Sequence, residues 1–218
     1  ICFFAENELL IEKIVAKYPK GKQASAVMPL LDLAQRQHNN WIPMKAIELI
    51  AERLEMAKIR VLEVASFYTM YNLKPVGKYF LQLCGTTPCM LRGSDDLSRC
   101  IEDKLGISSG EMTEDGKFSV LEVECLGACV NAPIVQVNDD FYEDLDYDSM
   151  SLLIESLNKN SPLPTGSVKR RFGSQAETGP TSLIKLTKKS SFKESSKKLD
   201  KKANTFAKQA GNKFNAQG

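Results

Sequence analysis

Two close pairs of cysteines constrain this chain more than any other feature of its sequence. Four residues separate Cys84 from Cys89, and three separate Cys125 from Cys129. Each pair begins where a predicted strand ends, because a short apolar run precedes Cys84 and apolar and polar residues alternate before Cys125. We therefore expect four sulfur atoms on loops at one edge of a small sheet.

Four cysteine thiolates suit either a zinc ion or an iron–sulfur cluster. Structural zinc sites usually contain tight C-x2-C pairs, and neither pair has that spacing. A [2Fe–2S] cluster has two irons that each need two thiolates, so two looser pairs match it better. The predicted ligands of one [2Fe–2S] cluster are Cys84, Cys89, Cys125 and Cys129. The alternatives are a zinc site, disulfides, or buried structural cysteines.

The composition bears on the disulfide alternative. Apolar residues make up 43% of the chain and charged residues 26%, as in soluble globular proteins. No stretch approaches the roughly 18 consecutive apolar residues of a membrane-spanning helix. The first six residues have no basic segment and no long apolar core, so we expect no complete signal peptide. The cysteines should then sit in a reducing compartment, which disfavours disulfides.

Residues next to the cysteine pairs suggest how the reduction potential of a cluster would be set. Gly85 and Gly127 would let backbone N–H groups approach the inorganic sulfides without an intervening Cβ. Such donors raise a cluster's reduction potential. The acidic side chains of Glu122, Glu124 and Asp139 are expected to lower it.

The other candidate ligands receive plainer interpretations. Cys100 falls within a predicted helix and is interpreted as a small buried side chain, and Cys2 is given no role. The sequence lacks the C-x-x-C of a thiol–disulfide oxidoreductase after its first strand. His38, the single histidine, is interpreted as a solvated residue at a helix end, which argues against a Rieske-type site with two histidines.

Residues 1–74 are predicted to form a small helical bundle. Apolar residues recur at helical spacing in four segments, around residues 9–15, 26–37, 46–54 and 61–71. Phe67, Tyr68 and Tyr71 are interpreted as core aromatics, or as the apolar centre of an interface if the chain works in a complex.

Residues 75–160 change to the period of strands. Strands are predicted at 78–84, 118–125 and 134–138, and helices at 94–105 and 150–157. Ser94 is a predicted N-cap and Gly106 a predicted helix stop. A polar turn is expected at Asp139-Asp140. The order strand–helix–strand–strand–helix resembles a thioredoxin-like fold, and the whole chain is predicted to be α+β.

Residues 161–218 are predicted to be an extended or disordered basic tail. They hold thirteen Lys and Arg against three acids, a net charge of +10, whereas residues 1–160 have a net charge of −8. Few bulky apolar residues are present, so burial cannot offset the cost of ordering the backbone. Contact with an acidic partner or anionic lipid, or nonspecific nucleic-acid binding, are the alternatives for this tail.

The cysteine motifs lie within sequence that closely resembles a known family. The matching segments are Cys-Gly-Thr-Thr-Pro-Cys at 84–89, Glu-Cys-Leu-Gly-Ala-Cys-Val-Asn-Ala-Pro at 124–133, and residues 18–31, 65–72, 91–97 and 138–143. They resemble the E subunits of the bacterial NADH:quinone oxidoreductase (complex I), the counterparts of the small mitochondrial flavoprotein-fraction subunit, within the thioredoxin-like [2Fe–2S] ferredoxins. The resemblance extends from about residue 5 to about residue 183.

This resemblance implies an electron-transfer subunit of respiratory NADH dehydrogenase with one [2Fe–2S] cluster on Cys84, Cys89, Cys125 and Cys129. It implies a neighbouring subunit that binds NADH and FMN, and electron exchange with that flavin. It also implies a place in the peripheral arm, on the cytoplasmic face of the bacterial inner membrane or the mitochondrial matrix side, with indirect membrane association. We expect no nucleic-acid partner, no complete active site in this chain alone, and no nucleotide binding by it, since no P-loop or G-x-G-x-x-G occurs.

Two other functions compete with this interpretation. A diaphorase module of an NAD-linked hydrogenase or formate dehydrogenase would carry related subunits with the same four-cysteine pattern. A zinc-stabilised interaction module would use the cysteines only as a structural clasp.

Overall fold

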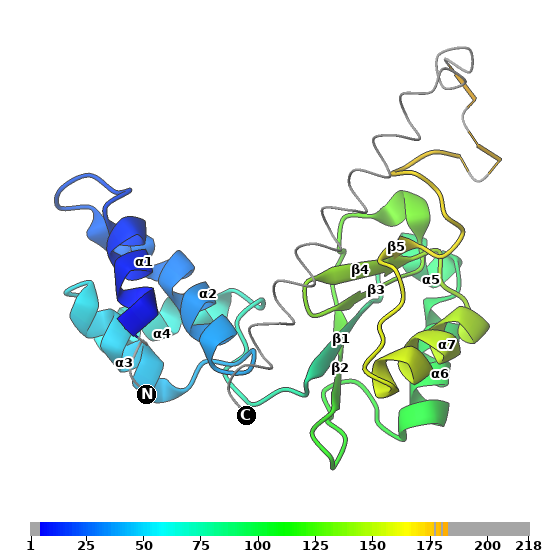
Figure 1. The fold of residues 1–218 in the computed structure, drawn as a ribbon, viewed down its shortest axis with the longest axis horizontal. Coiled ribbons are helices and arrows are strands. Elements are labelled where there is room, and N and C mark those ends of the chain that lie inside the picture. Colours follow the sequence, from blue (N-terminus) through cyan, green and yellow to red (C-terminus); the bar gives the residue numbers. More distant parts are fainter. Residues whose placement is uncertain (1–4, 177, 180, 183–218) are drawn as a thin grey trace. The chain divides into compact units, whose positions relative to one another are not determined.

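The computed structural model describes residues 5–176, 178, 179, 181 and 182 (Figure 1). Cys2 and the remainder of the predicted basic tail lie outside the described residues. The chain divides after Val168 into two compact units. In the described part of the second unit, the Arg171 guanidinium donates to the carbonyl of Gln175 at 3.1 Å. Among the described residues, every helix is too short or too polar to cross a bilayer.

Helices occur in all four predicted parts of the N-terminal segment, although the last, predicted at 61–71, spans 58–67. They are α1 (Ala5–Val15), η1 (Gln23–Ala26), α2 (Val27–Gln37), α3 (Met44–Arg53) and α4 (Lys58–Phe67). Their apolar faces meet in one cluster of buried side chains, which includes Ile11, Leu30, Ile47, Ile50 and Val61. An amphipathic helix gains most of its stability from such packing rather than from its own propensity.

The core interpretation of the three aromatics holds for Tyr71 and is wrong for Phe67 and Tyr68. Tyr71 is 6% exposed, and its hydroxyl donates to the carbonyl of Met28 at 2.9 Å. Phe67 is 77% exposed and Tyr68 is 41% exposed. The buried residue Ala65 lies two positions before Phe67, about 200° around the helix, so Phe67 points away from the core.

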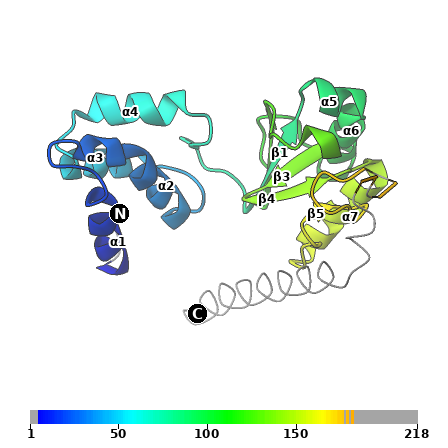
Figure 2. The ribbon, with the colours of Figure 1, turned by 90° about the horizontal axis from the view of Figure 1, so that it is seen from above.

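The second half of the first unit is built on a five-stranded sheet. Its elements are β1 (Tyr79–Cys84), α5 (Thr87–Leu91), α6 (Ser94–Leu105), β2 (Phe118–Val123), η2 (Cys129–Asn131), β3 (Ile134–Val137), β4 (Asp140–Glu143), α7 (Tyr147–Asn158) and β5 (Gly166–Ser167). The strand order is β2-β1-β3-β4-β5, with β1, β3 and β4 side by side (Figure 2). Strands β1 and β2 are parallel, whereas β3 is antiparallel to both β1 and β4.

The two faces of this sheet are covered differently. Leu81 and Leu83 of β1 point to the face on which α6 and α7 pack, in one cluster of buried apolar side chains. Successive side chains of a strand alternate between faces. Phe80 and Gln82 therefore lie on the opposite face, together with Gln136 of β3, and line a pocket there.

Local chemistry explains where helix ends depart from the predictions. Gly93, at φ +100°, is the N-cap of α6, and the predicted cap Ser94 is instead its first residue, buried and without a capping hydrogen bond. Helix α7 begins three residues earlier than predicted, because Asp146 and Ser149 form a reciprocal capping box. Gly106 ends α6 in a left-handed conformation, as predicted.

The short elements η1, α5, η2, β4 and β5 were not predicted. The polar turn lies at residues 138–139, with Asn138 at φ +55°, and Asp140 already starts β4. Residues 161–168, assigned to the tail in the sequence analysis, include β5. This strand pairs with β4, and the Tyr142 hydroxyl donates to the carbonyl of Leu163 at 3.3 Å. A two-residue strand leaves no periodic signal in sequence, because its structure comes from its partner strand.

Candidate metal centre

The first cysteine pair lies in a tight, buried turn at the end of β1. Cys84 is the last residue of β1 and Cys89 lies within α5, and both side chains are buried. The N–H of Cys89 donates to the carbonyl of Thr86 at 2.9 Å, which folds the chain back toward Cys84. The N–H of Gly85 donates to the carbonyl of Val123 at 3.2 Å, tying this turn to the end of β2.

The two buried thiols differ in acidity. Burial, followed by hydrogen bonding to Cys84, raises the pKa of Cys89 to about 12. Burial also opposes ionisation of Cys84, but hydrogen bonds from the Thr86 hydroxyl and from the backbones of Thr86 and Leu126 give it a net lowered pKa. The Leu126 backbone belongs to the second cysteine loop, so the two loops meet at Cys84.

The second pair lies on the loop that follows β2 and is more exposed. Cys125 is exposed and Cys129, the first residue of η2, is half-buried. Their sulfur atoms are 3.2 Å apart. The hydrogen bond with Cys129, and then that from the Gly127 N–H, lowers the pKa of Cys125, whereas the same contact with Cys125 raises the pKa of Cys129.

The structure places the loops of both cysteine pairs at the same end of β1 and β2. The parallel register pairs Cys84 with Val123, so the two loops leave the sheet side by side. Cys84 and Cys89 share a buried apolar cluster with Ile134. Leu126 packs against this cluster. The Thr86 hydroxyl contributes to lowering the pKa of both Cys84 and Cys125, which belong to different pairs.

The four cysteines offer two pairs of thiols. All five described cysteines are free thiols. Within the described part of the chain, no three His, Cys, Asp or Glu side chains converge as a ligand group for one metal ion. A [2Fe–2S] cluster places its two irons apart, each with two thiolates, so it asks for two neighbouring pairs. The two loops after β1 and β2 each carry one such pair of cysteines.

The two glycines have different local contacts. Gly127 has φ +84°, a conformation that glycine adopts without strain, and its N–H donates to Cys125 Sγ at 3.4 Å. This donor therefore serves a cysteine sulfur. A Cβ on Gly85 would overlap the carboxylate of Glu122, so Gly85 makes room for that side chain.

Asp139 lies far from the cysteines along the strands, contrary to the sequence-based expectation. Strand β3 runs antiparallel to β1, so the residues after β3 return to the beginning of β1, where Phe80 N–H donates to Asn138 Oδ1 at 3.0 Å. The Asp139 carboxylate accepts hydrogen bonds from Arg36 at 2.7 and 3.2 Å. Arg36 also donates to Asp32 at 3.0 Å.

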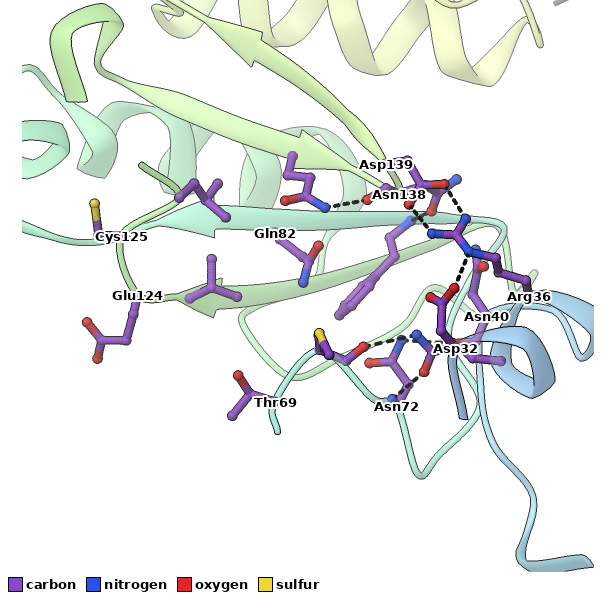
Figure 3. A pocket seen from close by; sticks show the side chains of 16 residues that line it. Asp32, Arg36, Asn40, Thr69, Asn72, Gln82, Glu124, Cys125, Asn138 and Asp139 are labelled. Atoms are coloured by element: carbon purple, nitrogen blue, oxygen red, sulfur yellow. Dashed lines mark hydrogen bonds and ion pairs between the residues drawn. The ribbon is translucent and has the colours of Figure 1, made fainter. Parts of the chain in front are cut away.

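A pocket lies between these two ends on the sheet face opposite α6 and α7, and residues 32–40 and 69–72 of the helical segment also line it (Figure 3). Its volume is about 410 Å³. Figure 3 shows Cys125 and Glu124 at one end of the strands and the Arg36–Asp139 ion pair at the other. Only the cysteine end of this pocket belongs to the candidate metal centre.

Cys100 and His38 lie outside the centre. The Cys100 side chain is buried, as predicted, and its thiol donates to the carbonyl of Tyr147 at 3.4 Å. His38 is the C-cap of α2, the helix end that was predicted. Its ring is half-buried and packs edge-on against Trp41 with ring centroids 4.7 Å apart, so it is less solvated than expected.

Sequence reasoning missed Thr86. Its hydroxyl lies 3.3 Å from Cys84 Sγ. The available signal was a hydroxyl two residues after a strand-ending cysteine, a spacing at which Ser and Thr side chains commonly make local hydrogen bonds.

Comparisons with known proteins agree with the predicted fold and family. The family described as thioredoxin-like [2Fe–2S] ferredoxin matches residues 11–158, which confirms the predicted thioredoxin-like fold. The E subunit of NADH-quinone oxidoreductase from Rickettsia bellii (strain RML369-C) is 57% identical over 155 residues, covering 71% of this chain and 93% of the relative. NADH dehydrogenase [ubiquinone] flavoprotein 2, mitochondrial, of Dictyostelium discoideum is 48% identical over 182 residues, covering 84% of this chain and 74% of that protein.

Solved structures give a more distant likeness. An NAD+-reducing [NiFe]-hydrogenase in the air-oxidised state has a TM-score of 0.53 and 21% identity, covering 61% of this chain and 23% of that chain. At this level of identity the likeness concerns the fold alone.

Proposed function

Since this chain belongs to the thioredoxin-like [2Fe–2S] ferredoxins, and among them to the E subunits of NADH-quinone oxidoreductase, we propose that it binds one [2Fe–2S] cluster. The proposed ligands are Cys84, Cys89, Cys125 and Cys129. The observation that carries this proposal is the gathering of two free thiol pairs on adjacent loops at one end of a rigid sheet. The chain is thus a subunit of an oxidoreductase, and its own contribution is electron transfer.

The residues around the thiols suit that task. When bound, the cluster supplies one-electron redox chemistry. Cys84 and Cys89, with Ile134 beside them, keep water from one side of the site. Cys125 lies at the surface, where an electron donor or acceptor could approach. The Gly127 N–H donates to Cys125 and holds that sulfur in place.

The proposed electron partner is FMN in a neighbouring NADH-binding subunit. Under this proposal NADH and FMN are bound by that partner, and the complex holds this chain in its peripheral arm, on the cytoplasmic face of the inner membrane or the matrix side. The helical segment 1–74 would contribute to docking, and its exposed aromatics Phe67 and Tyr68 support this role. Residues 75–160, completed by β5, would form the cluster domain, followed by the basic tail.

A diaphorase module of an NAD-linked hydrogenase is the second candidate assembly. It is kept as a candidate because a domain of the same fold occurs in an NAD+-reducing [NiFe]-hydrogenase, which by itself says nothing of this chain's partners. The Rickettsia bellii relative, at 57% identity, favours NADH-quinone oxidoreductase more strongly. The partner chains that co-purify with the native protein would distinguish these assemblies.

The deciding experiment is a metal and sulfide analysis of the full chain purified without oxygen. We expect two irons and two acid-labile sulfides per chain, and an EPR signal that appears on reduction with dithionite. One zinc per chain, without sulfide or an EPR signal, would instead make the cysteines a structural clasp and overturn the electron-transfer function.

A further inference from the structure

Thr86 occupies a capping position but does not cap. It is the N-cap residue of α5, with the extended backbone typical of that position. An N-cap threonine ordinarily accepts a hydrogen bond from a backbone N–H in the first helical turn, and Thr86 makes no such bond. Its Oγ1 atom lies 3.3 Å from Cys84 Sγ instead. The hydroxyl is therefore directed at a proposed ligand sulfur.

The direction of this hydrogen bond follows from the state of the sulfur. In the free chain either atom could donate. A cysteine that binds iron is a thiolate, which has no proton to give, so only the Thr86 hydroxyl can then be the donor. Cys84 is buried, so water competes little for this sulfur.

We propose that Thr86 tunes the reduction potential of the cluster upward by donating a hydrogen bond to Cys84 Sγ. This inference rests on the proposed function. Reduction adds one negative charge to the cluster and its thiolates, and a fixed donor stabilises the more negative state. Thr86 thereby opposes the carboxylate of Glu122, a β2 residue whose side chain lies beside Gly85.

The test is a redox titration of the full, cluster-loaded chain, followed by EPR. In this titration dithionite gives one electron to the cluster. No covalent bond to Thr86 forms or breaks. Thr86→Val keeps the shape of the side chain and removes the donor, whereas Thr86→Ser keeps the donor. Thr87→Val is the matched control, because Thr87 is the next residue and is exposed.

We expect Thr86→Val to make reduction three- to tenfold less favourable, a potential lower by about 30 to 59 mV for a one-electron couple. Thr86→Ser should restore most of this difference, and Thr87→Val should match the unmutated chain. Iron and sulfide contents are measured on each variant, so that a change in potential is read only from intact clusters.

Three outcomes would overturn the inference. Equal potentials for Thr86→Val and Thr87→Val would show that the hydroxyl does not tune the cluster, while the proposed function stands. If Thr86→Val and a second variant, Thr86→Ala, both lose the cluster while Thr86→Ser keeps it, Thr86 acts in assembly rather than in tuning. A colourless zinc protein from the unmutated chain would remove the proposed function and this inference with it.

Discussion

The two cysteine pairs are built differently, although they leave the sheet on neighbouring strands. Cys84 and Cys89 lie in a buried turn between a strand and a short helix, whereas Cys125 and Cys129 lie on a partly exposed loop whose glycine has a left-handed backbone. The same ligand type thus sits in two environments. Under the proposed function, the buried pair would shield the site from water and the exposed pair would offer a surface at which electrons can be exchanged.

The sharpest contrast between the pairs is in thiol reactivity. In the full chain without its cluster, we expect Cys125 to be alkylated faster than Cys89 by on the order of a hundredfold at neutral pH. Cys125 is exposed and its pKa is lowered, while Cys89 is buried with a pKa raised to about 12. The Cys89 rate should keep rising with pH toward 12, and the Cys125 rate should level off below the ordinary thiol pKa. Mass spectrometry of iodoacetamide-treated protein measures both, and equal rates would contradict the contrast.

Loss of a buried ligand should release the cluster. Cys89→Ala removes one thiolate, and we expect iron retention to fall by more than about tenfold, since even groups outside the ligand set change metal affinity about 10- to 100-fold. Iron content and the rate of iron transfer to a chelator measure this effect. Cys100→Ala is the matched control, because Cys100 is equally buried but lies in α6. Full iron retention in Cys89→Ala would remove this residue from the ligand set.

The exposed loop depends on its glycine. Gly127→Ala would force a side chain into a left-handed conformation, at a cost of about 1–2 kcal/mol. Gly116→Ala carries the same kind of strain in another turn, at φ +67°, and serves as the control. Both should lower the unfolding free energy, but only Gly127→Ala should speed the loss of iron. Equal rates of iron loss would mean that the loop conformation does not matter to the site.

The smallest expected effect concerns acidic residues at the two ends of the strands. Glu122→Gln should raise the reduction potential slightly, because its carboxylate lies beside Gly85. Asp139→Asn should leave the potential unchanged, because Asp139 lies at the opposite strand end and is neutralised by Arg36. Asp139→Asn should lower the free energy of unfolding by about 0.2–1 kcal/mol, the usual contribution of an exposed ion pair. Redox titration and thermal unfolding of both variants test this, and a larger shift for Asp139→Asn would contradict it.

The sequence was most informative where a repeating pattern existed. The helices around residues 27–37 and 94–105, and the strands that end at the cysteine pairs, follow from apolar spacing and were predicted closely. The gathering of the four cysteines followed from their position at strand ends. Residues 140–143 and 166–167 form strands only because a neighbouring strand offers hydrogen-bond partners, and no local pattern reveals that.

The direction of strands and the contacts of side chains were harder to predict than the type of each element. Asp139 was expected to lie near enough to the cysteines to lower the potential of a cluster. The antiparallel return of β3 carries it to the other end of the sheet. Phe67 was assigned to the core by its apolar character, although its angular position on α4 turns it outward. Thr86 falls in a loop segment of the sequence, and its hydroxyl comes close to Cys84 Sγ only in the folded turn.

The parallel pairing of β1 and β2 has a consequence for how such a site can change over evolutionary time. Because Cys84 and Val123 are partners in the register, both loops start from adjacent, fixed points. An insertion or deletion between the cysteines of either loop would alter the ligand spacing without shifting a strand. The unequal spacings of four and three residues are therefore compatible with one pair of strands, and either loop can change in length without moving β1 or β2.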